Sequence, residues 1–410
     1  MRVSRRSLIA AASAAPLARL TPAAADGAAP LALPDRDFCA PTDVTYLDSG
    51  SQHPISVAGR KAIDTYLAKR ELDPANAAYN LPEDEVRAKF AKLVNAASPD
   101  EIAFVQSTTT GEQMVLRGLG LPQPGAHIVT DTLHFFGSLP LYEEMARQGC
   151  DVSWVKDRDG RISLDDMKRA IRPGTKLIAL SLVSTINGFE HDLKAVCDLA
   201  HANGALVYAD IIHAAGCVPI DVQASGVDFA ACASYKWLMG DFGLGFLYAR
   251  EELLGRVIDR SQYGYYQAAS MATHILPFDS PGTDPLTFEW NKSATGYFEV
   301  GSQANAALAA LSKSLPYLRK LGVANIEAHR QPLLRRLEQE MPRLGFQPVT
   351  PPGSKSALIT FAVRSTAPYL KRLKQANMNV RVGETFIRLS PSVYNDMSDI
   401  ERFLEAVKPA

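Results

Sequence analysis

Two ionisable residues follow apolar stretches of the sequence at points where buried strands are expected to end. Asp210 closes the run ALVYAD, and Lys236 comes shortly after the run FAACAS. A lysine that is removed from water loses proton affinity and becomes a nucleophile that can form a Schiff base. A carboxylate at the end of a neighbouring strand can hold the proton of a ring nitrogen, which keeps a bound pyridine ring an electron sink. The pattern therefore indicates amine chemistry at one edge of a sheet.

Further segments supply other groups that such chemistry uses. Hydroxyl residues 107–110 and Gly111 lie at a strand-to-helix junction, where N–H groups and hydroxyls bind phosphate. His134 follows the run HIVTD and can stack on a planar ring, and His213 lies three positions after the aspartate. Arg388, in the run FIRLS, can bind a carboxylate in bidentate fashion. Each feature alone has an ordinary explanation as a helix cap, a structural histidine, a surface ion pair or a surface lysine. Together they predict a site for pyridoxal 5′-phosphate (PLP).

Short apolar runs alternate with amphipathic helical patterns in the first three quarters of the chain. The runs predict strands at 101–106, 127–131, 151–155, 176–183, 205–210, 229–234 and 245–249. Helices are expected between them, at 110–120, 137–149, 163–171 and 192–204. This alternation favours an α/β fold with a mostly parallel central sheet and helices on both faces. In such a fold, ligands bind at the carboxyl ends of the strands.

The pattern changes toward the C-terminus. Residues 262–302 are aromatic and broken by Pro and Gly, which predicts a long irregular loop. A long helix is expected from about 303 to 321, and a smaller α+β unit follows it. The predicted domains are a twin-arginine-type signal peptide at 1–25, a large PLP-binding domain with an N-terminal arm at 26–300, and a small C-terminal domain at 301–410.

The start of the chain has the layout of an export signal. Arg5 and Arg6 precede an Ala/Leu-rich stretch, and residues 23–25 offer a small-residue cleavage site. The context SRRSLI resembles the twin-arginine motif, although Leu8 replaces the usual Phe. The stretch is too short to span a bilayer. We expect a periplasmic or secreted protein with no membrane insertion after signal removal. A disordered leader on a cytoplasmic protein is the alternative.

The composition argues against several other classes of protein. The 43 basic and 44 acidic residues leave no net field that would attract nucleic acid or an anionic membrane. The eight histidines and five cysteines show no metal-ligand spacing, and an odd number of cysteines cannot pair completely. We therefore expect a small-molecule substrate, no nucleic-acid partner, no metal and no disulfide framework.

The motifs resemble the aminotransferase class V group of fold-type-I PLP enzymes, which includes cysteine desulfurases, kynureninases and isopenicillin N epimerase-like proteins. The resemblance runs from TYLDSGSQHPISV to RLSPSVYND, and the pair DxxH and SYK is its most specific part. It implies a fold-type-I PLP transferase that forms a homodimer. It gives Lys236 the covalent attachment of PLP, Asp210 the pyridine nitrogen, and His134 stacking on the ring. It also implies that Thr108, Thr109 and Tyr235 bind the phosphate of PLP, and that His213 lies beside the phenolic oxygen or the phosphate. Ser302 would contact the phosphate in the neighbouring subunit. Arg388 would bind the α-carboxylate of the substrate.

The sequence departs from the family pattern in places that bear on the reaction. Desulfurases carry a nucleophilic cysteine before the carboxylate-binding arginine, yet no cysteine follows Cys232, so persulfide chemistry of that kind is not expected. Thr185 stands where the family has an asparagine, with Asn187 nearby, and Ala233 replaces a phosphate-binding serine.

We expect an isopenicillin N epimerase-like enzyme that acts on the amino group of an amino acid or amino-acid-bearing peptide. Transamination or epimerisation is the expected reaction, with periplasmic tailoring of a natural product as one setting. One alternative is a PLP-dependent C–S or C–C lyase. Another is a non-catalytic PLP-binding or sugar aminotransferase-like protein, which would not need Arg388 as a carboxylate clamp.

Overall fold

A computed structural model describes Leu33, Phe38 and residues 43–408. The signal peptide predicted at 1–25 and Cys39 lie outside the described residues. Within the described part of the chain, no helix combines the length and the apolar character needed to cross a membrane.

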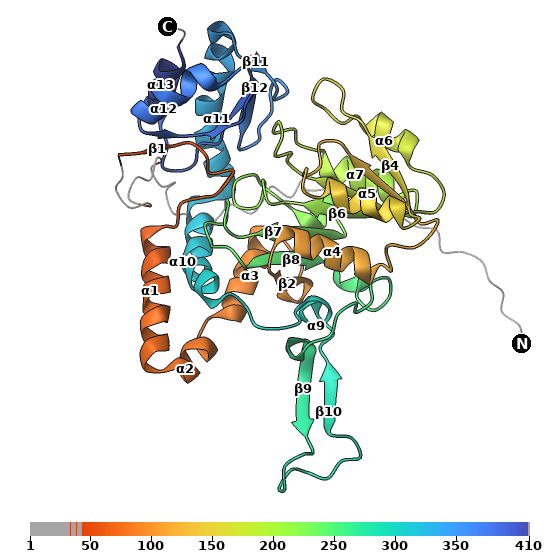
Figure 1. Cartoon of the computed structure of the whole chain (residues 1–410). Coiled ribbons are helices and arrows are strands. Elements are labelled where there is room, and N and C mark those ends of the chain that lie inside the picture. The colour runs from red at the N-terminus through yellow and green to blue at the C-terminus, as the bar shows by residue number, and fades with distance from the viewer. Residues whose placement is uncertain (1–32, 34–37, 39–42, 409–410) are drawn as a thin grey trace, which may run out of the picture. The chain divides into compact units, whose positions relative to one another are not determined.

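The centre of the fold is a seven-stranded sheet in the order β2-β8-β7-β6-β5-β3-β4 (Figure 1). Its strands are β2 (Ile102–Val105), β3 (His127–Asp131), β4 (Asp151–Val155), β5 (Thr175–Ser181), β6 (Leu206–Asp210), β7 (Phe229–Ala233) and β8 (Gly245–Ala249). Only β8 runs against its neighbours, and the other adjacent pairs are parallel. The sequence prediction of a mostly parallel sheet is confirmed.

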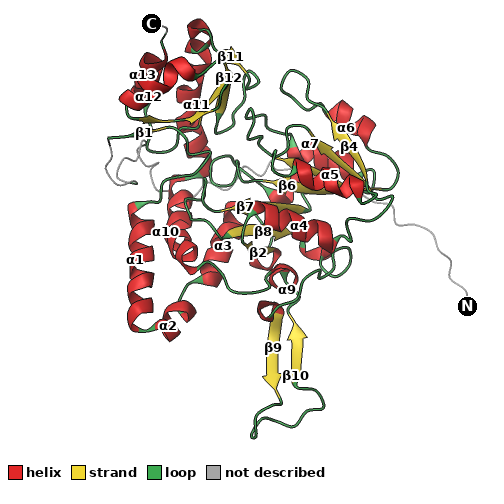
Figure 2. Cartoon of the chain, in the orientation of Figure 1, coloured by secondary structure: helices red, strands yellow, loops and turns green. Residues whose placement is uncertain are grey.

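Both faces of this sheet are buried beneath helices (Figure 2). In β7, for example, Ala230 and Cys232 pack into one apolar cluster, whereas Phe229 and Ala231 pack into the other. The first cluster includes side chains of α3 (Glu83–Leu93), α6 (Leu164–Ala170) and α7 (Leu193–His201). The second includes side chains of α4 (Thr108–Gly118), α5 (Leu139–Arg147) and α9 (Ala294–Phe298). Burial on both faces explains why these strands are apolar throughout rather than alternating.

The strand directions gather polar residues at one edge of the sheet. Because β2, β3, β5, β6 and β7 run the same way, their carboxyl ends lie together. Asp131, Ser181 and Asp210 are the last residues of β3, β5 and β6. The candidate site therefore lies where an open parallel sheet ordinarily binds its ligand.

The long helix α10 (Asn305–Leu321) packs beside α1 (Val57–Leu72), as Figure 1 shows. The sequence analysis included this helix in the small domain. Its buried Leu308, Leu311 and Leu315 instead lie in the same apolar cluster as the central sheet. The helix therefore contributes to the core of the sheet domain.

A second, smaller layer follows α10. Its four-stranded antiparallel sheet has the order β11-β12-β15-β14, formed by β11 (Gln347–Pro348), β12 (Ile359–Ala362), β15 (Phe386–Leu389) and β14 (Arg381–Val382). It packs with α11 (Val323–Glu340), α12 (Ala367–Gln375) and α13 (Met397–Val407). Leu47 also lies in this core, and β1 (Thr45–Tyr46) pairs in parallel with β13 (Met378–Asn379). The segment near residue 47 is thus attached to the C-terminal layer. The remaining helices are the short α2 (Pro74–Tyr79) and α8 (Val222–Ser225).

The prediction of a long irregular loop at 262–302 is wrong in part, because this segment contains a β-hairpin. Strands β9 (Ala268–Thr273) and β10 (Leu286–Trp290) pair in antiparallel fashion. Asp279 orders the connection, because its carboxylate accepts hydrogen bonds from the N–H groups of Ile275 and Leu276. Pro and Gly residues in this connection disrupted the sequence pattern on which the loop prediction depended.

Candidate active site

Lys236 lies in a tight loop between β7 and β8. The N–H of Ser234 donates to the carbonyl of Leu244, and the N–H of Gly240 donates back to the carbonyl of Ser234. Met239, in the same loop, has the left-handed φ of 58°, which a non-glycine residue adopts only when its surroundings demand it. The side chain of Lys236 is nearly buried, with 8% of the residue exposed. The loop therefore holds the amine away from bulk water.

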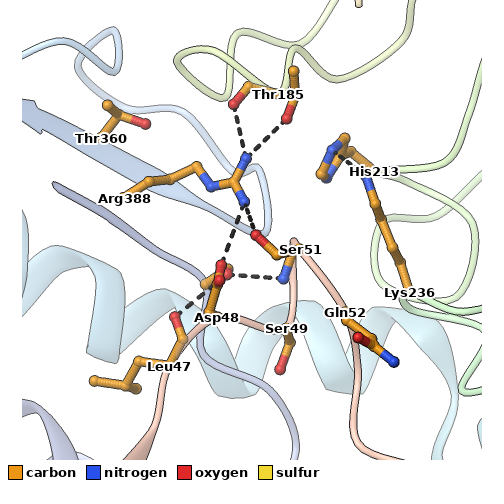
Figure 3. Close-up of polar contacts among 12 residues, drawn as sticks. Leu47, Asp48, Ser49, Ser51, Gln52, Thr185, His213, Lys236, Thr360 and Arg388 are labelled. Atoms are coloured by element: carbon orange, nitrogen blue, oxygen red, sulfur yellow. Dashed lines mark hydrogen bonds and ion pairs between the residues drawn. The ribbon is translucent and has the colours of Figure 1, made fainter. Parts of the chain in front are cut away.

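The Lys236 amine faces His213, and the two are hydrogen-bonded with 3.0 Å between Nζ and Nε2 (Figure 3). Burial lowers the pKa of Lys236 from 10.5 to about 8, although the charge of Asp210 acts in the opposite direction. Burial, and then the charges of Lys236 and Arg388, lower the pKa of His213 well below its usual value. His213 is therefore a neutral acceptor, and its Nδ1 has no partner among the described residues.

Asp210 ends β6 in a buried position and is fixed by the turn that follows. The N–H of Ile212 donates to its Oδ1 at 2.9 Å, and the hydroxyl of Ser181 lies 3.5 Å from its Oδ2. Burial raises the pKa of Asp210 from 3.8 to about 6, against the opposing effects of the Ile212 N–H and of His134. The charges of Asp210 and Lys236 act on each other's pKa, the carboxylate raising that of the amine and the amine lowering that of the carboxyl.

His134 is fully buried just beyond β3. Its Nδ1 lies 2.9 Å from Ser181 Oγ, and its Nε2 lies 3.0 Å from Oε1 of Glu112 on α4. Both ring nitrogens thus have partners within the protein. The stacking on a planar ring that was expected of His134 stays a prediction.

The start of α4 fits the predicted phosphate site. Ser107 caps the helix by accepting a hydrogen bond from the N–H of Thr110, and the first N–H groups of a helix have no internal acceptors. The N–H of Ala233, at the end of β7, donates to Thr108 Oγ1 at 2.9 Å, and Thr109 is half-buried. A side chain at Gly111 would lie 2.9 Å from the Cβ of Ala231, so this close approach requires glycine. These contacts hold the start of α4 against the strand that precedes the lysine.

Two other residues expected at the phosphate contact segments other than the start of α4. Tyr235 is half-buried and stacks on Phe242, with 4.2 Å between ring centroids. Ser302 is exposed and lies 3.0 Å from the hydroxyl of Tyr265. Their proposed roles toward phosphate stay predictions.

Arg388 reaches from β15 toward the central sheet, and Figure 3 draws its guanidinium opposite the His213–Lys236 pair. Its Nη1 donates to the carbonyl and the hydroxyl of Thr185, in the loop after β5, at 3.1 and 2.8 Å. Its Nη2 donates to Ser51 Oγ at 2.7 Å and to Asp48 Oδ1 at 3.3 Å. Burial lowers the pKa of Arg388, whereas the charge of Asp48 acts in the opposite direction. The guanidinium already has protein partners on both terminal nitrogens, and its Nε has none among the described residues.

Several of these residues were missed by sequence reasoning. Glu112 follows Thr108 by four positions, a helical spacing that places both on one face and could have drawn attention to it. Asp48 and Ser51 stand in the quoted stretch TYLDSGS, but nothing local links them to an arginine more than 300 positions later. Asn187, which was noted as a nearby candidate, donates to the carbonyl of Gly160 and accepts from a backbone N–H in its own turn.

The donor set fits PLP. A buried amine of lowered pKa, a buried carboxylate and the start of a helix suit its aldehyde, its ring nitrogen and its phosphate, respectively. Lys236, Asp210 and the residues around Thr108 would hold these groups. The unpaired Nδ1 of the buried His213 also leaves a polar contact for a bound molecule to complete.

The raised pKa of Asp210 predicts that this residue destabilises the protein when no cofactor is bound. Its folded pKa of about 6 exceeds the unfolded value of 3.8, so its penalty is absent below about pH 4 and complete above about pH 6. At pH 7.5, Asp210→Asn should therefore raise the free energy of unfolding of the cofactor-free protein by roughly 1–3 kcal/mol. Urea titrations at pH 7.5 and pH 4.5 measure this difference. An Asp210→Asn variant that is less stable than wild type at pH 7.5 would contradict the assignment.

The chain matches the family model for aminotransferase class-V over residues 61–403. A cysteine desulfurase of Klebsiella pneumoniae subsp. pneumoniae is 32% identical over 302 residues, which cover 71% of each protein. A cysteine desulfurase of Klebsiella pneumoniae strain 342 is 28% identical over 390 residues, or 89% of this chain and 93% of the relative.

Solved structures show the same fold. The cysteine desulfurases of Escherichia coli and Thermococcus onnurineus NA1 give TM-scores of 0.76 and 0.77 at 23% and 22% identity, each covering 89% of this chain and 94% of the other. A cystine C–S lyase in complex with its product cysteine persulfide gives a TM-score of 0.75 at 20% identity, covering 89% of this chain and 98% of the other. The expected fold is therefore confirmed, and the chain belongs to the aminotransferase class-V family of PLP-dependent enzymes.

Proposed function

We propose that the protein acts on the amino group of an α-amino acid, either free or carried by a peptide. The observation that carries this proposal is the placement of Arg388 near Lys236. Figure 3 draws the Arg388 guanidinium opposite the His213–Lys236 pair, and the arginine charge acts to lower the pKa of both Lys236 and His213. An amino acid offers one group to each of them, an amine to the lysine site and a carboxylate to the guanidinium.

Bound PLP supplies an electron sink that weakens the bonds at the α-carbon of an attached amine. The protein's own groups provide the proton transfers. The pKa of the Lys236 amine, about 8, is close enough to neutral pH for Nζ to accept the α-proton and to return it. Neutral His213 keeps this amine in place through its hydrogen bond. Asp210 supplies the negative charge that favours a proton on the ring nitrogen.

Transamination and epimerisation both begin with removal of the α-proton by such a base, and they remain the reactions we propose. Tailoring of a natural product in the periplasm is the setting proposed for them. The second candidate is a C–S or C–C lyase, which is favoured by the names of the relatives, several desulfurases and a cystine C–S lyase. Elimination from a sulfur-containing amino acid releases the sulfur without any enzyme thiol.

A nucleophilic cysteine finds no support in the described residues. The four described cysteines are free and buried. Burial raises the pKa of Cys197 and Cys217 to about 12, far from the lowered values of reactive thiols. We therefore do not propose sulfur transfer through a cysteine of the enzyme.

We also propose a homodimer in which Ser302 contacts the partner's phosphate group. The exposure of Ser302 suits a residue that serves a neighbouring subunit.

We predict that PLP attaches to the protein at Lys236. After incubation with PLP and reduction with borohydride, peptide mass mapping should find the added mass on Lys236, because its amine is the buried one of lowered pKa. Lys236→Ala should lose both this label and the visible absorbance of the bound cofactor. Lys156→Ala, which removes an exposed lysine, should keep both. Labelling at several lysines without preference would rule out the proposed site.

Whether the substrate is an amino acid can be tested directly. A panel of L- and D-amino acids and short peptides is incubated in deuterated water, and solvent deuterium at Cα is measured by NMR, together with keto acid, opposite enantiomer, pyruvate and sulfide. Deuterium with keto acid or enantiomer supports the proposal, and pyruvate with sulfide from cysteine or cystine supports the lyase. Neither exchange nor product from any carboxylate-bearing compound would overturn both.

For a compound that reacts, Arg388→Lys should raise KM about 10- to 100-fold with a smaller effect on kcat, since the planar fork is lost and the charge is kept. Arg381→Lys is the matched control, because Arg381 is exposed and pairs with Arg388 in the neighbouring strand. Equal KM values for wild type and Arg388→Lys would remove the carboxylate clamp and favour a sugar substrate.

Export is proposed from the leader sequence alone. Arg5→Lys combined with Arg6→Lys should leave the protein in the cytoplasm of a bacterium that carries the twin-arginine system, because that system requires the arginine pair. Fractionation of cells that express the tagged full-length chain measures this. An unchanged distribution of the double variant would argue for a non-targeting leader.

A further inference from the structure

A buried carboxylate lies behind the candidate site and has no part in the function described so far. Glu112 of α4 is 1% exposed and is surrounded by hydrogen-bond donors. Ser138 donates to its Oε2 at 2.6 Å, and Tyr142 donates to its Oε1 at 2.5 Å. His134 Nε2 lies 3.0 Å from the same Oε1. A charge buried this deeply is costly unless it is paired and hydrogen-bonded, and these three partners meet that requirement for Glu112.

The contacts form a continuous chain from Glu112 to the carboxylate at the end of β6. His134 joins Glu112 to Ser181, with 2.9 Å between Nδ1 and the hydroxyl oxygen. Ser181 in turn lies 3.5 Å from Oδ2 of Asp210. Three elements hold the far end in place, namely α4, the start of α5 and the segment after β3.

We propose that Glu112 is a positioning residue that keeps a proton on Nε2 of His134 and, through Ser181, keeps Asp210 ionised for the cofactor's ring nitrogen. This inference rests on the PLP-dependent chemistry but not on the identity of the substrate.

The count of hydrogens supports this role. The Ser138 and Tyr142 hydroxyls can both donate to Glu112, so an ionised carboxylate accepts from them and from Nε2–H. Ser181 has a single proton and already accepts the N–H of Phe135 at 3.0 Å. If His134 carries protons on both nitrogens, its Nδ1–H donates to Ser181, and the serine proton is free to point at Asp210. If His134 is neutral and its one proton stays on Nε2 beside Glu112, Ser181 must give its proton to Nδ1, and Asp210 loses that donor.

The surrounding charges agree with a protonated imidazole. The titratable groups that act on His134 are Glu112 from α4, Asp131 at the end of β3 and Asp210 at the end of β6, with Tyr142 of α5 in ring contact. Burial opposes protonation of His134, but Glu112 and then the two aspartates outweigh it and raise its pKa. Oδ2 of Asp131 also lies 3.3 Å from Nε2 of His191. Burial keeps the pKa of Tyr142 well above its usual value, so Tyr142 remains a donor.

The effect of Glu112 on the pKa of Asp210 follows from the charges that act on this carboxyl group. Burial raises the pKa of Asp210, and the charge of His134 is among the interactions that lower it again. The charge of Glu112 itself acts the other way, but more weakly than that of His134. Removing the Glu112 charge therefore deprives His134 of its proton, and the loss of that cation raises the pKa of Asp210. Less Asp210 is then ionised at neutral pH.

The test uses Glu112→Gln, which keeps the size of the side chain and removes its charge. In the cofactor-free protein with ¹⁵N-labelled histidine, the titration midpoint of His134 should fall by about one pH unit or more. Spectra of a His134→Gln variant identify the resonance. Glu299→Gln is the matched control, because Glu299 is also buried and pairs with Arg87 on a different part of the fold. This control should leave the His134 midpoint unchanged.

Two further readouts separate positioning from simple structural support. For any compound that reacts, the acidic limb of the kcat/KM profile should move to higher pH in Glu112→Gln, with kcat reduced more than KM is raised. Tyr142→Phe removes one donor and leaves the carboxylate in place, so it should shift the His134 midpoint less than Glu112→Gln does. It also serves as the test variant if Glu112→Gln does not fold, and it should then still change the midpoint measurably.

The inference is overturned if the His134 midpoint in Glu112→Gln equals that of wild type, or if Glu299→Gln shifts it equally. Because the titration is read without cofactor or substrate, it gives its answer even if no amino acid proves to be a substrate.

Discussion

Removal of Lys236 and Asp210 from water is the constraint on which the rest of the site depends. Burial acts on the two groups in opposite directions, lowering the pKa of the amine to about 8 and raising that of the carboxyl to about 6. Their ordinary values of 10.5 and 3.8 are thereby brought much closer together. An amine with such a pKa can attack an aldehyde and can carry a proton near neutral pH. Exposure to solvent would undo both shifts, so the chemistry requires the fold to remain closed around these groups.

The fold meets this constraint largely by fixing the backbone around the two groups. Asp210 is held by the N–H of Ile212, and the loop around Lys236 is closed by hydrogen bonds of Ser234 and by the left-handed Met239. The contact between Gly111 and Ala231 brings the start of α4 against the same strand. The partner of the lysine is a neutral imidazole and not a carboxylate, which would have raised the pKa of the amine. The stability lost to desolvation is offset by the apolar packing on both faces of the sheet.

Sequence reasoning found those parts of the site that are encoded locally. Asp210, Thr108 and His134 follow apolar runs, and the end of a buried strand can be located from such a run alone. Glu112 and Ser181 were missed because their importance arises only when α4, α5 and β5 pack around His134. Likewise, α10 was assigned to the smaller unit because its amphipathic pattern gives its buried face but not the cluster that the face joins. The hairpin of β9 and β10 was missed because a connection rich in Pro and Gly masked its two short strands.

The carboxylate clamp proposed for Arg388 would tie substrate recognition to the packing of the two layers. Its partner Asp48 follows a strand that pairs with the C-terminal layer, whereas its partner Thr185 lies in the loop after β5 of the central sheet. A guanidinium buried between layers is tolerated when its charge is balanced, and Asp48 provides that balance before any ligand arrives. A substrate carboxylate must therefore compete with Asp48 and Ser51 for Nη2, or use the unpaired Nε. A carboxylate that binds the guanidinium weakly, or an uncharged analogue, gains little binding energy from displacing Asp48 and Ser51. The ion pair between Arg388 and Asp48 thus stabilises the contact between the layers and also limits which ligands can bind.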